Sequence, residues 1–325
     1  MTGLLALIAL ASLQAGPRLP LPCVFWSRAV DETLALVKDA QIASLCVPPE
    51  LVAGWRAAGV DAVPLSAADL AARTALPAPG IEHRPDLVSA TRSPWLAANG
   101  WRFLRHPEGQ YRYNAGPGAA ALAAAEAFAY GGNAVLSLDS PDLAEVGRML
   151  SFLGELPATD GHAPLADFGL VDDGSDEMGE VTNLLVRRNL LFELLKNPSS
   201  RYRINVVPGA KGYSPADLAD PSEFALRIRH QLTDAARTLR IFGTEVVICR
   251  ATSNPNGVRL HLLNYGGHEI QGLRVRIRGK YREGDAQVFG SGHSRLDAFV
   301  VTGGASEFSI PRMTTYAVID LTRVR

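Results

Sequence analysis

The chain has 325 residues, enough for about two domains of ordinary size, and 47% of them are hydrophobic against 20% charged. This composition supports a buried core and excludes a disordered, collagen-like or disulfide-scaffold protein. Lys and Arg number 32 and Asp and Glu number 33, so the formal net charge is -1. That balance offers no general attraction to nucleic acid or to a membrane surface, and we expect neither as a partner.

The first 15 residues have the pattern of a secretion signal. Residues 4–13 form an apolar run without charge, and Gly16 and Pro17 then break any helix. About ten apolar residues are too few to span a bilayer but match the hydrophobic part of a signal peptide. The alternative is a buried first strand or helix of the domain. We expect cleavage near Ala15, no further membrane segment, and a periplasmic or extracellular protein.

From residue 16 to residue 156 the sequence alternates short apolar runs with alanine-rich stretches. Such alternation predicts strand–helix units and a largely parallel sheet. A full eight-stranded barrel needs about 250 residues, so we expect a shortened TIM-barrel-like or open parallel α/β domain. The predicted strands cover residues 42–47, 60–65, 101–105 and 134–138, and the predicted helices cover 31–40, 49–58, 118–130 and 143–153.

A second α/β unit is predicted over residues 165–250, after a linker-like segment at 157–164. Its long helix begins after the acidic turn at 172–177 and is expected to stop at Pro198, because proline cannot continue a helix. The other predicted elements are strands at 167–171, 203–207 and 245–249 and a helix at 221–239.

Residues 251–325 change to a period of two, which predicts an antiparallel β-sandwich with one solvent-facing side. Five cations alternate along one strand of it, at Arg274, Arg276, Arg278, Lys280 and Arg282. This face either binds a polyanion or is a solvated face that opposes edge pairing.

Several kinds of site are missing from the sequence. It has no GxxxxGK[ST], strand-anchored GxGxxG, HExxH or GxSxG motif, and its seven histidines lack metal-ligand spacing. We therefore expect no cofactor and no metal. The cysteines Cys23, Cys46 and Cys249 are far apart without a CxxC pair, and their odd number makes even one disulfide doubtful.

Carboxylates at the carboxyl ends of parallel strands are the candidate catalytic groups, because ligands bind there in α/β folds. Asp139 directly follows the predicted strand 134–138, and Glu82 and Asp86 lie in the segment GIEHRPD with His83 and Arg84. Glycoside hydrolysis needs two carboxyl groups, one as acid and one as nucleophile or base. The alternative for each is a helix cap or a loop ion pair.

All four tryptophans lie within the first 101 residues, and Tyr111 and Tyr113 follow shortly. Their rings offer a stacking surface for sugars, although burial in the core is the alternative for each. The candidate carbohydrate-binding residues are Trp26, Trp55, Trp95, Trp101, Tyr111 and Tyr113, together with the polar His83 and Arg84.

The order of parts resembles multidomain bacterial glycoside hydrolases. FGLVDDGSDEMGEVTNLLVRRN at 168–189 is similar to the opening of the flavodoxin-like, glutamine amidotransferase-like domain of beta-galactosidases of the trimerisation-domain type. VRLHLLNY at 258–265 and YAVIDL at 316–321 resemble the terminal sandwich of such enzymes. SPWLAANGWRFLR at 93–105 and EVTNLLVRRNLL at 180–191 look like segments of uncharacterised exported bacterial proteins of this layout.

The resemblance implies a carbohydrate substrate but transfers no catalytic residue. Since the middle unit lacks a GxCxG elbow, we expect it to be structural. The first hypothesis is an exported glycoside hydrolase-like protein acting on a poly- or oligosaccharide through Glu82, Asp86 and Asp139. The second is a non-catalytic carbohydrate-binding or scaffolding protein derived from such an enzyme, and the third is an amidotransferase- or esterase-like hydrolase.

Overall fold

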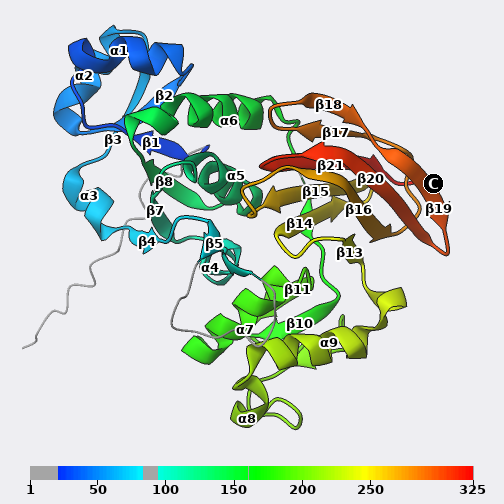
Figure 1. Ribbon diagram of the computed structural model, residues 1–325. Coiled ribbons are helices and arrows are strands. Elements are labelled where there is room, and N and C mark those ends of the chain that lie inside the picture. Colours follow the sequence, from blue (N-terminus) through cyan, green and yellow to red (C-terminus); the bar gives the residue numbers. More distant parts are fainter. Residues whose placement is uncertain (1–20, 83–93, 160, 325) are drawn as a thin grey trace, which may run out of the picture.

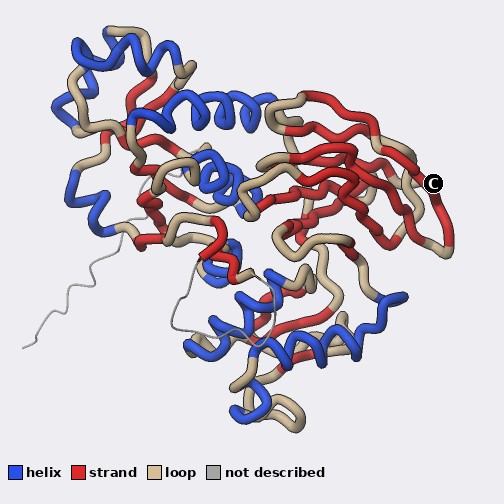
Figure 2. The backbone as a smooth tube through the Cα atoms, viewed as in Figure 1, coloured by secondary structure: helices blue, strands red, loops and turns tan. Residues whose placement is uncertain are grey.

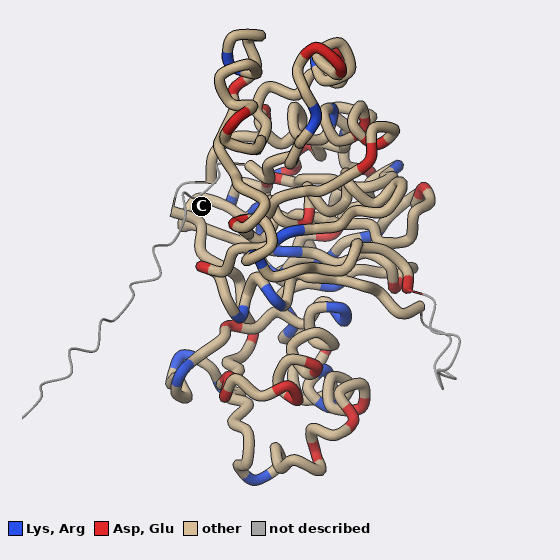
Figure 3. Tube along the Cα trace, turned by 90° about the vertical axis from the view of Figure 1, so that its left-hand side faces the viewer, with Lys and Arg blue, Asp and Glu red and all other residues tan. Residues whose placement is uncertain are grey.

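The computed structural model describes residues 21–82, 94–159 and 161–324, which form a parallel α/β unit, a smaller α/β unit and a β-sandwich (Figure 1). The predicted signal segment lies outside these residues. Helices occur in the two α/β units, whereas the sandwich consists of strands and loops (Figure 2). Lysine, arginine and acidic residues occur along all parts of the trace (Figure 3). No helix in the described ranges is long and apolar enough to cross a bilayer.

The first unit contains a six-stranded, all-parallel sheet in the order β3-β2-β1-β8-β7-β4. Successive strands along the chain are neighbours, and the last strand pairs with the first. This is the cyclic order of a barrel that is open between β3 and β4, and it confirms the prediction of an open parallel sheet. The strands are β1 (Cys23–Phe25), β2 (Ser44–Val47), β3 (Asp61–Pro64), β4 (Thr74–Leu76), β7 (Gln110–Asn114) and β8 (Asn133–Ser137).

The helices of this unit follow the strands closely. Ser66 caps the start of one of them, since its side chain accepts a hydrogen bond from the Asp69 amide. Gly147 permits close packing of two others: a Cβ there would lie 1.7 Å from the Ala40 carbonyl oxygen. The helices of the first unit are α1 (Val30–Asp39), η1 (Pro49–Leu51), α2 (Val52–Ala57), α3 (Ala67–Ala72), α4 (Gly100–Arg105), α5 (Ala120–Tyr130), η2 (Ser140–Asp142) and α6 (Leu143–Glu155).

Two features differ from the predictions for this unit. The predicted strand at 101–105 is the helix α4, because Trp101 and Leu104, three residues apart, share one side of a helix and pack on the core. Cys23 and Cys46 form a disulfide between the neighbouring strands β1 and β2, with their Cα atoms 5.9 Å apart. The odd cysteine is Cys249, which is buried.

The second unit has a three-stranded parallel sheet in the order β11-β10-β12. Its long helix α7 (Asp176–Arg187) starts at Ser175 but ends well before Pro198, because Asn189 has a φ of 53° and turns the chain into β11. Its other elements are β10 (Phe168–Val171), β11 (Phe192–Leu195), β12 (Asn205–Val206), α8 (Pro215–Leu218) and α9 (Pro221–Ala236).

The sandwich packs two antiparallel sheets face to face, and the predicted period of two is seen directly. Leu273, Val275 and Ile277 are buried between the sheets, while Arg274 and Arg278 are exposed. One sheet contains β13 (Leu239–Phe242), β16 (Ile270–Arg278), β20 (Ala305–Met313) and β19 (Asp297–Thr302). The other contains β18 (Gly292–Arg295), β17 (Asp285–Val288), β21 (Tyr316–Thr322), β15 (Gly257–Asn264), β14 (Val247–Asn254) and β9 (Ala163–Pro164).

Two segments that the sequence placed elsewhere thus belong to the sandwich. The strand predicted for the middle unit at 245–249 is β14, which pairs along its whole length with β15. The linker-like segment 157–164 contributes β9, which pairs with β14. Helix α5 lies against both β8 and β15, so the first unit and the sandwich share one continuous core.

Candidate functional site

A groove of about 1730 Å³ lies between a short hairpin, α7, the start of α9 and the link from β13 to β14. The hairpin consists of β5 (Gly80–Glu82) and β6 (Trp95–Ala97), which pair in antiparallel fashion. Glu82 and Trp95 are direct cross-strand partners, so their side chains lie on the same side of the hairpin. The structure therefore brings two of the predicted site residues together in this groove.

Trp95 is the aromatic residue of the groove that the sequence singled out. Its ring is partly exposed, and the guanidinium carbon of Arg187 lies 4.0 Å from the ring centroid. Arg187 also donates a hydrogen bond to the Pro94 carbonyl oxygen at 3.3 Å, which ties α7 to the hairpin. The cation–π contact and this bond fix the ring on the groove wall.

The groove combines exposed apolar side chains with charged ones. Ile81 and Leu226 remain 39% and 50% exposed, which is unusual for large aliphatic residues in this chain. Glu180, Leu184 and Arg187 are spaced four and three residues apart, so one face of α7 forms a wall. Such a mixture of apolar surface and convergent polar groups is typical of a ligand site. The other charged residues lining it are Asp176, Glu177, Arg188, Asp220, Glu223, Arg229, Arg237, Arg240 and Glu245.

Asp139 lies elsewhere. It follows the end of β8 at Ser137 by two residues and is exposed, but it is not among the residues that line the groove. The next acid, Asp142, accepts the Gly118 amide with both oxygens at 3.1 Å and so anchors a loop. Asp139 and Glu82, two of the three candidate catalytic carboxylates, are therefore not brought together in one groove. His83, Arg84 and Asp86 lie outside the described residues.

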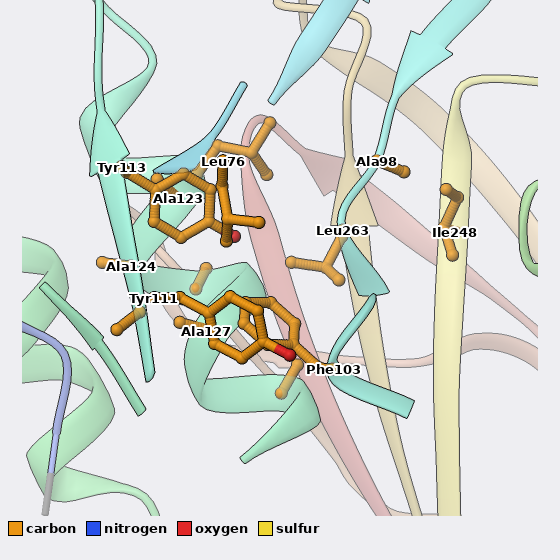
Figure 4. Packing of buried hydrophobic residues seen from close by; sticks show 14 of the residues in the cluster. Leu76, Ala98, Phe103, Tyr111, Tyr113, Ala123, Ala124, Ala127, Ile248 and Leu263 are labelled. Carbon is orange, nitrogen blue, oxygen red and sulfur yellow. The ribbon is translucent and has the colours of Figure 1, made fainter. Parts of the chain in front are cut away.

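Four of the six predicted sugar-stacking residues are core residues, which corrects the sequence interpretation. Trp55 and Tyr113 are 0% exposed, and Trp26 and Tyr111 are 3% exposed, so a sugar ring has no face to stack on. Figure 4 shows Tyr111 and Tyr113 packed among Phe103, Leu76 and alanines of α5.

Trp101 is partly exposed but lies at a different contact. Arg102 covers its ring at 4.2 Å, and the ring also approaches Gly179 of α7. It therefore packs between α4 and α7 and is not a groove residue.

The buried carboxyl group of Glu126 was missed by the sequence analysis. Glu126 lies on α5 and is 0% exposed. Its carboxylate accepts hydrogen bonds from the backbone amide of Asn99 and from the hydroxyls of Tyr113 and Tyr265, each at 2.6 Å. The Asn99 side-chain amide donates a fourth at 3.1 Å. Burial raises the pKa of Glu126, and these donors oppose that rise. The one visible signal was a lone charge within the alanine-rich sequence AALAAAEAFAY.

Glu126 joins two units and has no room for a ligand beside it. Asn99 and Tyr113 belong to the first unit, whereas Tyr265 follows β15 of the sandwich. Protein donors occupy the acceptor sites of both carboxylate oxygens, so the raised pKa of Glu126 reflects a structural position.

Asp172, at the end of β10, is also engaged by protein. Arg105 donates two hydrogen bonds to it at 2.7 and 2.8 Å, and the Gly174 amide donates a third. In the described part of the chain, no group of three His, Cys, Asp or Glu side chains could hold a metal ion.

The fold was compared with known proteins. No protein-family model matches the chain, and neither does any curated protein. Among solved structures, alpha-L-fucosidase isoenzyme 2 from Paenibacillus thiaminolyticus matches with a TM-score of 0.53 at 8% identity, over 69% of this chain and 62% of that one. The match with a rhamnosidase from Novosphingobium sp. PP1Y has 8% identity and a TM-score of 0.45, and it covers 84% of this chain and 38% of the rhamnosidase chain. The match with a beta-galactosidase from Rahnella sp. R3 has 10% identity and a TM-score of 0.41, and it covers 69% of this chain and 57% of the beta-galactosidase chain.

The chain thus spans less than two thirds of the length of each of these structures. The match with the fucosidase supports a shared architecture over about two thirds of this chain. The chain has a glycoside hydrolase-like fold.

Proposed function

We propose that this protein binds an oligo- or polysaccharide in the Trp95 groove, on a glycoside hydrolase-like scaffold that does not hydrolyse it. The observation that carries the proposal is the groove itself, in which the partly exposed ring of Trp95 lies beside Glu82 and Arg187. An aromatic ring held next to charged hydrogen-bonding groups suits the two faces of a sugar, one apolar and one hydroxylated.

Binding is favoured over hydrolysis by the state of the carboxyl groups. A general acid of a glycosidase needs a carboxyl with a raised pKa beside an open cleft, facing a second carboxylate. The raised pKa values of Glu126 and Asp167 belong to carboxyls that protein donors occupy, from Tyr113 and Tyr265 in the first case and Thr238 in the second. Asp172 is held by Arg105.

Hydrolysis in the same groove is the second candidate function. It is favoured by Glu82 and Glu180, which come to the groove from two different walls, the hairpin and α7. In that case Glu180→Gln abolishes turnover. Under the binding proposal there is no turnover to lose, and Asp139→Asn leaves binding unchanged.

The experiment is a binding screen of the full chain against soluble oligosaccharides that include fucosyl, rhamnosyl and galactosyl residues, followed by titration calorimetry of any sugar retained. We expect Trp95→Ala to weaken binding at least about tenfold, since a lost aromatic platform removes more than about 1.4 kcal/mol. Trp101→Ala is the matched control, because that ring is also covered by an arginine but lies outside the groove.

Two results would contradict the proposal. One is that no carbohydrate in the screen binds the folded protein. The other is that Trp95→Ala and Trp101→Ala bind the sugar equally well. Chromatography of the same mixtures detects hydrolysis products, and their appearance would favour the second candidate.

The proposal also includes export, because the first 15 residues have the pattern of a signal peptide. The mature protein from its native host then starts at Gly16 or within a few residues of it. Mass spectrometry that finds an intact Met1 would contradict this part of the proposal.

A further inference from the structure

A second, much smaller cavity lies where all three units of the protein meet. It has a volume of about 20 Å³ and is lined by residues of α4, α5, α7 and β14. The cavity is partly open to solvent, and a single water needs roughly 10–15 Å³ of such space, so there is room in it for about one water or one ion of similar size. Most of its wall is apolar, and the apolar lining residues are Leu104, Leu165, Val186, Leu190, Leu191 and Phe192.

Arg250 of β14 is the charged residue of this cavity. Its side chain is mostly buried, with its guanidinium carbon 5.6 Å from the centroid of the Tyr130 ring, which also lines the cavity. Within the described ranges, the Arg250 side chain makes no hydrogen bond and no ion pair. The hydroxyl of Tyr130 makes no hydrogen bond there either.

The charge of Arg250 is not compensated by neighbouring protein groups. Burial lowers its pKa, and the groups that oppose this are Tyr130 and Cys249, neither of which is a carboxylate. His261 is its direct cross-strand partner on β15. Burial, with the charges of Arg259 and Arg250, lowers the pKa of His261 to about 3, so this ring is neutral at physiological pH. Nearby Arg259 already has its own partner, Asp320, at 2.6 Å.

A guanidinium stays charged in proteins, and a mostly buried charge without an ion-pair partner is unfavourable, even though the Arg250 nitrogens keep some contact with solvent. We propose that this cavity binds a small monovalent anion of the size of chloride, held by the Arg250 guanidinium at the junction of the three units. The apolar walls favour a weakly hydrated anion, because a strongly hydrated one loses more on leaving water. The small volume favours such an anion over phosphate, sulfate and sugar acids.

An anion bound there stabilises the folded chain, since the site is built from segments that meet only in the folded state. By mass action, the stabilisation rises with the anion concentration, and above the Kd it grows only with the logarithm of that concentration. Non-specific screening by salt depends instead on ionic strength and not on the identity of the anion.

The experiment measures the Tm of the full chain at constant ionic strength while sodium chloride or bromide replaces sodium gluconate, whose anion is too large for the cavity. We expect a rise of about 3 °C between none and about 200 mM chloride. Arg250→Met abolishes this rise, while Arg295→Met, which removes an exposed arginine, retains it.

Arg250→Met also separates the proposal from a purely structural role of this residue. If Arg250 binds an anion, the Arg250→Met variant in gluconate is at least as stable as the unchanged protein, because an uncompensated charge is removed. If Arg250 matters through Tyr130 alone, the variant loses stability equally with or without chloride, and the proposal fails.

Crystals of the unchanged protein grown in sodium bromide provide a measurement that needs no variant. An anomalous peak within about 4 Å of the Arg250 guanidinium supports the site. A water without anomalous signal in that position, or a Tm that does not distinguish chloride from gluconate, overturns the proposal.

Discussion

Removing the hydroxyl of Tyr265 tests how the first unit and the sandwich are held together. This hydroxyl donates to the buried carboxyl of Glu126 at 2.6 Å, and Glu126 is 0% exposed. A hydrogen bond to a charged group contributes about 1.5–3 kcal/mol, and no water can replace the lost donor in a sealed site. We therefore expect Tyr265→Phe to lower the free energy of unfolding by about 2 kcal/mol.

The penalty depends on pH in a defined direction. The donors around Glu126 stabilise its ionised form, so the loss of one matters more when the carboxyl is charged. Since burial raises the pKa of Glu126 above 4.5, the penalty of Tyr265→Phe is small at acidic pH and grows as the pH rises through that raised pKa.

The assay is urea unfolding of the full chain followed by circular dichroism at several pH values. Tyr202→Phe is the matched control, because its hydroxyl also donates to a carboxylate, that of Glu193, but at a partly exposed site. We expect the control to cost at most about 0.5 kcal/mol. The reasoning is refuted if Tyr265→Phe costs no more than Tyr202→Phe, or if its cost falls as the pH rises.

Three further predictions concern buried groups. Because the pKa of Glu126 is raised in the folded state, Glu126 contributes stability below its unfolded pKa, and this stability is lost as the pH rises through the folded pKa. In urea titrations at several pH values, Glu126→Gln should flatten this decline of stability with pH, and an unchanged slope would refute the prediction. Burial raises the pKa of Asp172, but the hydrogen bonds from Arg105 and the Gly174 amide, with the charges of Arg105 and His106, together outweigh it and lower the pKa. Asp172→Asn should therefore cost about 2 kcal/mol at neutral pH and progressively less as the pH falls through the folded pKa. Replacing Cys23 and Cys46 together by alanine should cost about 3 kcal/mol, given the 23-residue separation, and an unchanged urea midpoint would contradict it.

The regular parts of the fold were predictable because the sequence repeats the period of the structure. Apolar residues at every second position mark β16, and the alternation of strands and alanine-rich helices predicted the open parallel sheet. The errors occurred where short apolar runs fit either state. Residues 101–105 form a helix in spite of their strand-like composition, and the turn at Asn189 ended α7 without a proline.

The candidate site was predictable only in part, because burial is a property of the assembled core. Trp55 and Trp95 are alike in the sequence, yet one is enclosed in the core and the other lines a groove. Glu82 was predicted from its place in a charged loop, but its partnership with Trp95 follows from the hairpin. Glu126 and Arg250 become notable only once separate units pack against each other, since their neighbours are far away along the chain.

Hydrogen–deuterium exchange of the full chain, with and without the oligosaccharide that binds best, tests the central claim most directly. Binding in the Trp95 groove predicts slower exchange in β6, in the exposed face of α7 and at the start of α9, with no change in the strands of the sandwich away from the groove. Protection confined to the cation-bearing face of β16, or no protection anywhere at saturating sugar, would contradict the account.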